Sequence, residues 1–361
     1  MTKKVLLICG SELCNAGVPN VIMKIVRGLQ SSYTFDVLCL SEKYGEYDAE
    51  FSSYGGKIYR LPLPDYASNK VLYPIRAFKV EKELKRVLSQ TTYDIIHCNC
   101  GIDSGICLMV SKRFGVPVRI SHAHGTYSRK GKNYILRAYN YIQKQLIKQN
   151  ATKLLACSSI AGDSLFSGAK YDNILNPVDV EIYRNVKKCS HDGINLLQIG
   201  YYCENKNQLF TLKVLEKLLE SGIEAKVHFI GFASEQDYYD KIKKYVANNN
   251  LEKSVCFLCS NADKVKELSW ADFSMLPSES EGLPLVALES QCANTICLMS
   301  DHIPKDSNIG YGLFLGYNNV TEWVKAIIDL KNTHQEEYEL TVDVSTKCYL
   351  RKMEAAYERS W

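Results

Sequence analysis

Two glutamates, Glu281 and Glu289, lie eight residues apart in the stretch PSESEGLPLVALESQ, residues 277–291. Pro284 suits the first position of a helix, so we expect a helix from Leu285 onward, with Glu281 just before it and Glu289 inside it. The residues three and four positions away from Glu289 are all apolar, which leaves this carboxylate without a cation on its own helical face. It therefore needs hydrogen-bond donors from another strand or from the hydroxyl groups of a ligand.

The elements that would position these carboxylates alternate between strands and helices, and the alternation starts twice. Strands buried on both faces are predicted at 4–9, 35–40, 57–61, 94–98, 116–121 and 152–157, and further strands at 193–200, 226–231, 255–259 and 273–276, with helical patterns between most of them. This order predicts an α/β protein with two Rossmann-like, doubly wound parallel sheets. We expect an N-terminal domain over 1–185, a C-terminal domain over 190–345, and a helix in 346–361 that packs back on the N-terminal domain.

Ligands of such sheets bind at the carboxyl ends of the strands, close to helix N-termini. In the first half these ends carry Gly17 in NAGVPNV, His97 in DIIHCN, and His122 and His124 in SHAHGT. Strand alternation points His122 and His124 to the same side. In the second half they carry residues 200–206 and 277–284, and both sets could face a cleft between the domains.

Composition indicates a soluble globular protein: 46% of the 361 residues are hydrophobic and 23% are charged. No apolar run approaches the roughly 18 residues that a membrane span needs. The 14 cysteines are scattered, and the CxxC pair Cys256 and Cys259 has no second pair at zinc spacing. They are expected to be small buried hydrophobes in a reducing cytoplasm, and we expect no metal site.

The net charge of +4 conceals an asymmetry, because residues 1–185 carry 25 Lys and Arg against 15 Asp and Glu, while the remainder carries 19 against 25. Residues 104–162 contain ten cations and no acid, and part of this segment mixes them with aromatic residues: Arg129, Lys130, Lys132 and Arg137 with Tyr127, Tyr134, Tyr139 and Tyr141. We expect this segment to dock on an anionic membrane surface. The alternatives are a solvated basic helix or a patch that faces the acidic second half. Nucleic acid is not expected, because no nucleic-acid motif accompanies the charge.

The motifs, taken in order, resemble the large retaining glycosyltransferase family 4, which has the two-domain GT-B fold. EGLPLVALE resembles the E-x7-E signature of that family, and ADFSMLPSESEGLPLVALESQ resembles the donor-site motif of bacterial capsular and exopolysaccharide transferases. NAGVPNV is similar to the glycine-rich first loop, ENKNQ to the phosphate-binding turn, and NPVD to the usual NGVD near the end of the first domain. The resemblance extends over nearly the whole chain.

The resemblance implies a role for each matching residue. Glu281 and His124 would act at the donor sugar, Lys206 at the diphosphate and Glu289 at the ribose. The nucleotide-sugar site would also include Gly17, Gly282, Leu283 and Pro284, with His97, His122 and Tyr201 as further candidates. The family commonly has an arginine where this chain has Tyr201 after Gly200. Without this arginine, one cation fewer is expected to stabilise the diphosphate leaving group.

The implied reaction is metal-independent, cofactor-free transfer of a hexose from a nucleotide sugar, UDP-linked by expectation, to a lipid-linked oligosaccharide or similar glycan acceptor in surface polysaccharide biosynthesis. The expected partners are this nucleotide sugar and a glycan or polyprenyl-diphosphate-linked acceptor. The protein would be cytoplasmic or peripheral on the inner face of the cytoplasmic membrane. Because of Tyr201, the alternative is a catalytically weak, sugar-nucleotide-binding partner subunit of another transferase. A Rossmann dehydrogenase is disfavoured, because GxGxxG is absent after the first strand.

Overall fold

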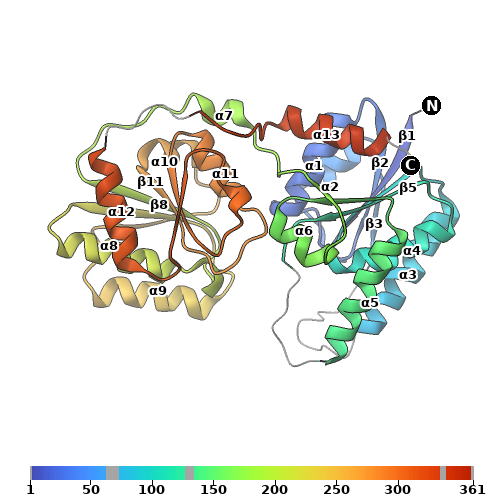
Figure 1. Ribbon diagram of the computed structural model, residues 1–361, viewed down its shortest axis with the longest axis horizontal. Coiled ribbons are helices and arrows are strands. Elements are labelled where there is room, and N and C mark those ends of the chain that lie inside the picture. The colour runs from blue at the N-terminus through green and yellow to red at the C-terminus, as the bar shows by residue number, and fades with distance from the viewer. Residues whose placement is uncertain (1, 62–72, 127–133, 334–338, 359–361) are drawn as a thin grey trace. The chain divides into compact units, whose positions relative to one another are not determined.

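The computed structural model describes residues 2–61, 73–126, 134–333 and 339–358. The chain divides into two compact units (Figure 1). The first unit comprises Met1–Pro177 and Thr346–Trp361, and the second comprises Val178–Ser345. Among the described residues, no helix is both long enough and apolar enough to cross a membrane.

A parallel seven-stranded sheet forms the centre of the first unit, in the order β3-β2-β1-β4-β5-β6-β7. Its strands are β1 Lys3–Cys9, β2 Tyr33–Cys39, β3 Ile58–Arg60, β4 Ile95–Asn99, β5 Val118–Ala123, β6 Lys153–Ala156 and β7 Asp172–Asn173. The helices are α1 Gly17–Leu29, α2 Asp48–Ser53, α3 Tyr73–Gln90, α4 Ser104–Arg113 after the short turn η2 Gly101–Asp103, α5 Tyr134–Asn150, α6 Ser159–Phe166 and α13 Thr346–Glu358.

Burial in this sheet follows strand position. Val5 to Cys9 of β1 are fully buried, because helices cover both faces of a central parallel strand. The prediction that 57–61 is buried on both faces was wrong, since all three residues of β3 are only half-buried at the sheet edge.

The last helix, α13, packs within the first unit. Its buried side chains Tyr349, Met353 and Tyr357 fall on one face at helical spacing and join the core cluster that contains α1 and β1. Figure 1 shows α13 in red beside the blue α1. Lys153 donates hydrogen bonds from Nζ to the carbonyl oxygens of Ala355 and Ala356, at the end where helix carbonyls lack partners.

A parallel six-stranded sheet forms the second unit, in the order β10-β9-β8-β11-β12-β13. Its strands are β8 Ile194–Ile199, β9 Ala225–Ile230, β10 Val255–Leu258, β11 Phe273–Leu276, β12 Ile296–Ser300 and β13 Gly312–Leu315. The helices are α7 Val180–Arg184, α8 Gln208–Glu220, α9 Gln236–Asn248, α10 Lys264–Trp270, α11 Leu285–Cys292 and α12 Val320–Asn332, with the short turns η3 Glu204–Lys206 and η4 Lys305–Ser307.

The border between the units lies earlier than the sequence suggested. Residues 178–185, expected in the first domain, belong to the second unit, because α7 packs on α11 and the Val178 amide donates to the Val344 carbonyl oxygen. The polar stretch before β8 suggested a border near residue 190, but it connects elements of one unit.

Candidate functional site

The strand order places two loops of the second unit side by side. β8 and β11 are neighbours in the sheet although the chain order reverses between them, so the loops after their carboxyl ends meet at a topological switch point. The Glu279 amide donates to the Asn205 carbonyl oxygen at 2.9 Å, and Asn205 Nδ2 donates to the Ser280 carbonyl oxygen at 3.0 Å. Asn207, in the left-handed conformation, donates from Nδ2 to the Pro277 carbonyl oxygen. The turn ENKNQ and the loop 277–284 therefore form one structure.

Lys206 and Glu281 meet at this point. Their Nζ and Oε1 atoms are 2.5 Å apart, and both side chains are largely buried, with 20% and 13% exposure. Gly200 lies against the lysine stem, since a Cβ there would be 3.5 Å from Lys206 Cδ. Two residues that the sequence predicted to contact one donor molecule are thus paired with each other.

Glu289 has partners that the sequence analysis did not identify. It lies inside α11, as expected, and its Oε2 is 3.2 Å from Lys264 Nζ, a residue of α10 rather than of its own helix. The pKa of Tyr183 is raised mainly by burial. The second cause is the neighbouring Glu289 carboxylate, to which Tyr183 is hydrogen-bonded. Glu289 is therefore not a carboxylate without a cation, because another helix supplies a lysine and α7 supplies a phenol.

The residues between the two glutamates shape the start of α11. Pro284 is extended and precedes the helix, so the prediction that it occupies the first helical position was off by one residue. Leu283 is buried and Gly282 is half-buried. Tyr201, by contrast, is 40% exposed and lies beside Phe232, which is 51% exposed, with ring centroids 4.6 Å apart. An aromatic pair thus occupies the strand ends where the family resemblance predicted an arginine.

In the first unit, β4 and β5 bring three histidines together. His97 Nε2 lies 3.3 Å from His122 Nδ1, and the rings of His122 and His124 are 4.0 Å apart. His124 Nε2 lies 2.9 Å from Asn99 Oδ1. Burial lowers the pKa of His97 to about 3 and that of His124 to about 4, and it also lowers the pKa of His122, so all three rings are neutral at pH 7.

Three polar residues of this cluster were missed in the sequence. Asn99 follows His97 by two residues and bonds to His124, while a hydrogen bond to Asn176 acts on the pKa of His124. Tyr357 of α13 bonds to His97 Nδ1 at 2.9 Å. Asn99 and Asn176 lie in the quoted motifs DIIHCN and NPVD, so the signal was present, but nothing in the local sequence connects Tyr357 with residue 97.

Gly17 is the first residue of α1 and is exposed, and a Cβ added there would meet no atom within 4 Å. It is therefore not required by packing within the first unit. This leaves the predicted close approach of a ligand open at that position.

Several cations of the segment 104–162 hydrogen-bond within the fold, in the part of it that the structure describes. Arg119 donates to the carbonyl oxygens of Val116 and Asn150, Lys148 to that of Ser167, and Lys153 to α13, so several of the ten cations serve the fold. Tyr139, predicted to suit an interface, is buried and donates to Asp103. Tyr127, Arg129, Lys130 and Lys132 lie outside the described residues.

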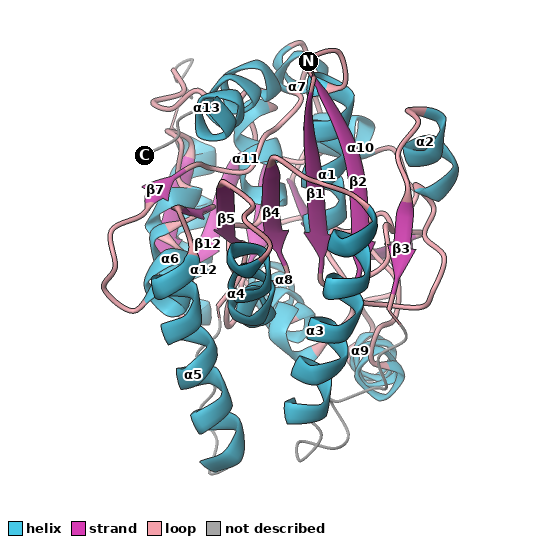
Figure 2. Ribbon diagram, turned by 90° about the vertical axis from the view of Figure 1, so that its right-hand side faces the viewer, coloured by secondary structure: helices cyan, strands magenta, loops and turns pink. Residues whose placement is uncertain are grey.

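α5 also exposes apolar side chains. Tyr134, Ile135, Tyr141 and Ile142 are between 49% and 78% exposed, and they recur at a seven-residue spacing along one side of the helix. Ile75 and Phe78 of the neighbouring α3 are 48% and 64% exposed. Figure 2 shows α3, α4 and α5 arranged side by side. We call these six residues the α3–α5 apolar surface.

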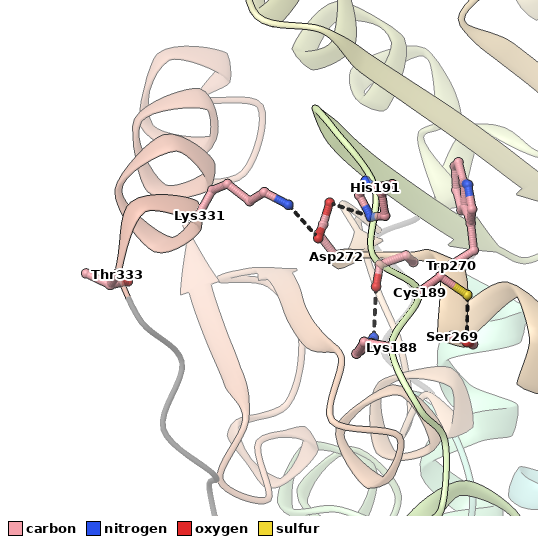
Figure 3. A pocket seen from close by; sticks show the side chains of 9 residues that line it. Lys188, Cys189, His191, Ser269, Trp270, Asp272, Lys331 and Thr333 are labelled. Carbon is pink, nitrogen blue, oxygen red and sulfur yellow. Dashed lines mark hydrogen bonds and ion pairs between the residues drawn. The ribbon is translucent and has the colours of Figure 1, made fainter.

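A thiol cluster and a cavity are two further features of the structure. The Sγ atoms of Cys98, Cys100 and Cys107, all buried, lie within 4.8 Å of one another, close enough to share a metal ion, but we assign these thiols to core packing. A cavity of about 220 Å³ lies at the amino ends of β8 and β11, the edge opposite to Lys206 and Glu281. Figure 3 shows Lys331 and His191 directed at Asp272 in its wall.

Family models match both halves of the chain. Residues 16–182 match the model described as Glycosyltransferase Family 4, and residues 179–341 match the model described as Glycosyl transferases group 1. Together the two models account for nearly the whole chain, each over roughly one of the two units.

Similar proteins are bacterial glycosyltransferases, one of them named for capsular polysaccharide biosynthesis. A putative glycosyltransferase EpsF of Bacillus subtilis is 26% identical over 320 residues, covering 84% of this chain and 80% of that protein. The capsular polysaccharide biosynthesis glycosyltransferase CapH of Staphylococcus aureus is 27% identical over 306 residues, covering 83% and 81%. An Escherichia coli UDP-Gal:alpha-D-GlcNAc-diphosphoundecaprenol alpha-1,3-galactosyltransferase is 20% identical over 300 residues, covering 74% and 76%.

Solved structures share the fold. HepE of Anabaena in complex with UDP and glucose superposes with a TM-score of 0.74 at 15% identity, covering 98% of this chain and 99% of that one. The lipopolysaccharide outer core galactosyltransferase WaaB gives a TM-score of 0.71 at 17% identity, with 98% and 96% coverage. Both the sequence resemblance and the two predicted parallel sheets are confirmed.

Proposed function

Because the chain belongs to the family 4-like glycosyltransferases of the GT-B fold and of polysaccharide biosynthesis, we propose that it transfers a hexose from a UDP-sugar to a polyprenyl-diphosphate-linked glycan. The observation that carries this proposal is the Lys206–Glu281 pair at the switch point. HepE, named in complex with UDP, and the E. coli relative, named for UDP-Gal and a diphosphoundecaprenol acceptor, support the choice of donor and acceptor.

The pair suggests how the donor would be received. A diphosphate brings two negative charges to Lys206, whose ammonium group would then leave Glu281 for the phosphate oxygens. The Glu281 carboxylate, freed from its cation, would accept hydrogen bonds from the sugar hydroxyls, next to Gly282 and Leu283 at the start of α11. Binding of the leaving group and exposure of the sugar-binding carboxylate would thus be one event.

Glu289 would hold the ribose. Its carboxylate is fixed from one side by Lys264 and Tyr183, so its orientation is set before the nucleotide binds. A charged carboxylate is acceptor-only and suits two adjacent ribose hydroxyls. Tyr201 and Phe232 would lie near the diphosphate without adding charge, so phosphate stabilisation would depend on Lys206 more than it does where an arginine is present.

In the first unit, His124 would bind the donor sugar as a neutral group. In the transfer itself the bond from the anomeric carbon to the diphosphate oxygen breaks, and the acceptor oxygen bonds to the same face of that carbon. The acceptor proton passes to the leaving diphosphate, which makes the reaction retaining without a protein nucleophile or a metal ion. Lys206 would stabilise the charge that develops on the diphosphate.

We also propose that the α3–α5 apolar surface rests on the inner face of the cytoplasmic membrane, where a lipid-linked acceptor is held. Exposed Tyr and Ile side chains suit the interfacial region of a bilayer. The cations of the same segment, including Arg137 and residues 129–132, would add attraction to anionic lipids.

The test uses two variants of the Lys206–Glu281 pair and calorimetric titration with UDP and with uridine. Lys206→Ala should weaken UDP binding roughly ten- to a hundredfold, the value of charge-assisted hydrogen bonds, and change uridine binding little. Glu281→Gln should leave UDP binding equal or tighter, because it releases Lys206, while turnover falls by roughly two orders of magnitude. Equal losses for UDP and uridine in Lys206→Ala, or a UDP affinity that collapses in Glu281→Gln, would contradict the proposal.

A further inference from the structure

A chain of hydrogen bonds leads from the C-terminal helix to the histidines of the first unit. Tyr357 Oη lies 2.9 Å from His97 Nδ1, and His97 Nε2 lies 3.3 Å from His122 Nδ1. All three side chains are fully buried. The chain ends at His122 Nε2, a buried atom without a partner among the described residues, in a ring that lies 4.0 Å from that of His124.

Tyr357 determines which atoms donate and which accept along this series of hydrogen bonds. Burial raises the pKa of Tyr357, so its hydroxyl keeps its proton, and among the described residues His97 Nδ1 is the one acceptor within reach. His97 must then carry its own proton on Nε2 and donate it to His122 Nδ1. The opposite direction would leave the buried Tyr357 O–H without an acceptor. His122 consequently carries its proton on Nε2.

Asn99 fixes the tautomer of the third histidine. Its Nδ2 donates to the His97 carbonyl oxygen at 3.2 Å, and since a carbonyl oxygen only accepts, the amide cannot be reversed. Asn99 Oδ1 therefore faces His124 Nε2, which must be the protonated nitrogen. The lone pair of His124 is left on Nδ1, which is buried, and the side chain of Asn176 is the further polar group that acts on this ring.

We propose that Tyr357 and His97 are positioning residues that set the tautomer of His122, so that a ring with its proton on Nε2 lies 4.0 Å from the ring of His124. The effect of this proton position on turnover, through His124, rests on the proposed function. The tautomers do not depend on it.

This assigns a role to α13 beyond packing. The helix follows the second unit in sequence but completes the core of the first, and its residue 357 sets a proton position two side chains away. A change that displaces α13 would alter which histidine nitrogens carry protons without touching the substrate.

The chain provides a matched control on the same helix. Tyr349 is also buried in α13, but its hydroxyl has no hydrogen-bond partner among the described residues. Tyr349→Phe and Tyr357→Phe therefore remove the same atom from the same helix, and only the second removes a hydrogen bond. The full-length protein, labelled with 15N at histidine, serves for NMR measurement of the ring-nitrogen protonation in the absence of substrate.

The wild type and Tyr349→Phe should both show His122 protonated on Nε2. Tyr357→Phe should show a mixture of both His122 tautomers, because no hydroxyl then donates to His97 Nδ1 and holds the His97 proton on Nε2. A wild-type His122 protonated on Nδ1, or a tautomer unchanged in a folded Tyr357→Phe, would overturn the proposal. If Tyr357→Phe does not fold, the wild-type spectrum alone decides, since it must show the Nε2 tautomer.

Turnover supplies a second measurement. Tyr357→Phe should lower kcat roughly three- to tenfold, the factor of one ordinary hydrogen bond, with the KM for donor nearly unchanged, and Tyr349→Phe should change neither. Equal losses in both variants would indicate packing alone and contradict the positioning role. If the expected tautomers are found but no UDP-sugar is turned over, the proposed function fails and the tautomer assignment stands.

Discussion

At the scale of single residues, each unit holds charged and polar candidate residues that pair with neighbours in the same unit. Lys206 neutralises Glu281, Lys264 neutralises Glu289, and Asn99 orients His124. A buried charge without such a partner would destabilise the fold. We expect a charged ligand to displace these partners, or to bind beside them, when it enters.

Glu289→Gln should test the ribose assignment. The variant keeps the size of the side chain but replaces one acceptor oxygen with a donor, so UDP affinity should fall about tenfold while the fold persists. Calorimetry with UDP measures the first effect and thermal unfolding the second. Glu216→Gln is the control, since Glu216 pairs with Tyr245 away from the strand ends. Unchanged UDP affinity in folded Glu289→Gln would refute the assignment.

The buried histidines predict a specific loss of stability in acid. The pKa of His124, about 4 in the fold and about 6.5 when unfolded, means that the unfolded chain binds more protons between these values. Stability is therefore present above pH 6.5 and is lost as the pH falls toward 4, by about 1 to 2 kcal/mol between pH 7 and 5 for this residue.

Urea unfolding of the wild type and of His124→Gln at pH 7 and pH 5 measures this loss. The variant should be less sensitive to pH by that amount, whereas His302→Gln, at an exposed position, should match the wild type. A His124→Gln variant with the full wild-type pH dependence would show that His124 is not held neutral.

At the scale of elements, the sequence predicted most of the strands but not the exposure of the edge ones. Period and composition identified β1, β4 and β11 within one or two residues, because buried apolar runs reflect the sheet directly. The edge strands β3 and β10 contain the same residue types yet are only half-buried, since exposure depends on strand order, which local sequence does not encode. The two-residue β7 has too few residues to show a period.

The candidate site residues also divide into those that local sequence predicts and those that depend on tertiary packing. His124, Lys206, Glu281 and Glu289 were predicted as site residues because they lie in motifs that follow strands. The pairing of Lys206 with Glu281, 75 residues apart, follows once β8 and β11 are known to be neighbours. Lys264 and Tyr357 were missed because each reaches its partner through tertiary packing.

The helix α5 makes the membrane proposal testable. Serine at Tyr134, Ile135, Tyr141 and Ile142 should abolish most sedimentation with anionic liposomes at any salt concentration, because apolar insertion is not screened. Glutamine at Arg129, Lys130, Lys132 and Arg137 should reduce sedimentation mainly at low salt, at about 1 kcal/mol per cation.

The matched control places serine at Tyr44 and Ile182, which are 83% and 56% exposed and lie outside α3 and α5. Control protein should sediment like the wild type, and all variants should bind UDP equally. Wild-type protein that ignores anionic liposomes, or serine variants that sediment normally, would exclude this surface as the docking site.

At the scale of the whole molecule, each unit contributes one part of the predicted chemistry. The second unit holds the paired cation and carboxylate for a diphosphate sugar, and the first holds neutral histidines. The proposed transfer would require both units to act on one donor molecule. Sequence could predict this division because the α/β pattern starts twice, once before each set.

The most direct measurement of the central claim is acceptor-dependent release of UDP by the purified protein in the presence of EDTA. The reaction would contain a panel of UDP-hexoses and undecaprenyl-diphosphate-linked GlcNAc, with the linkage of the product determined by NMR. We expect that at least one UDP-hexose gives UDP and an α-linked product in equal amounts, and that Glu281→Gln loses both. A folded, UDP-binding protein that transfers from no UDP-hexose, or that does so only with a divalent metal or with a β-linked product, would contradict it.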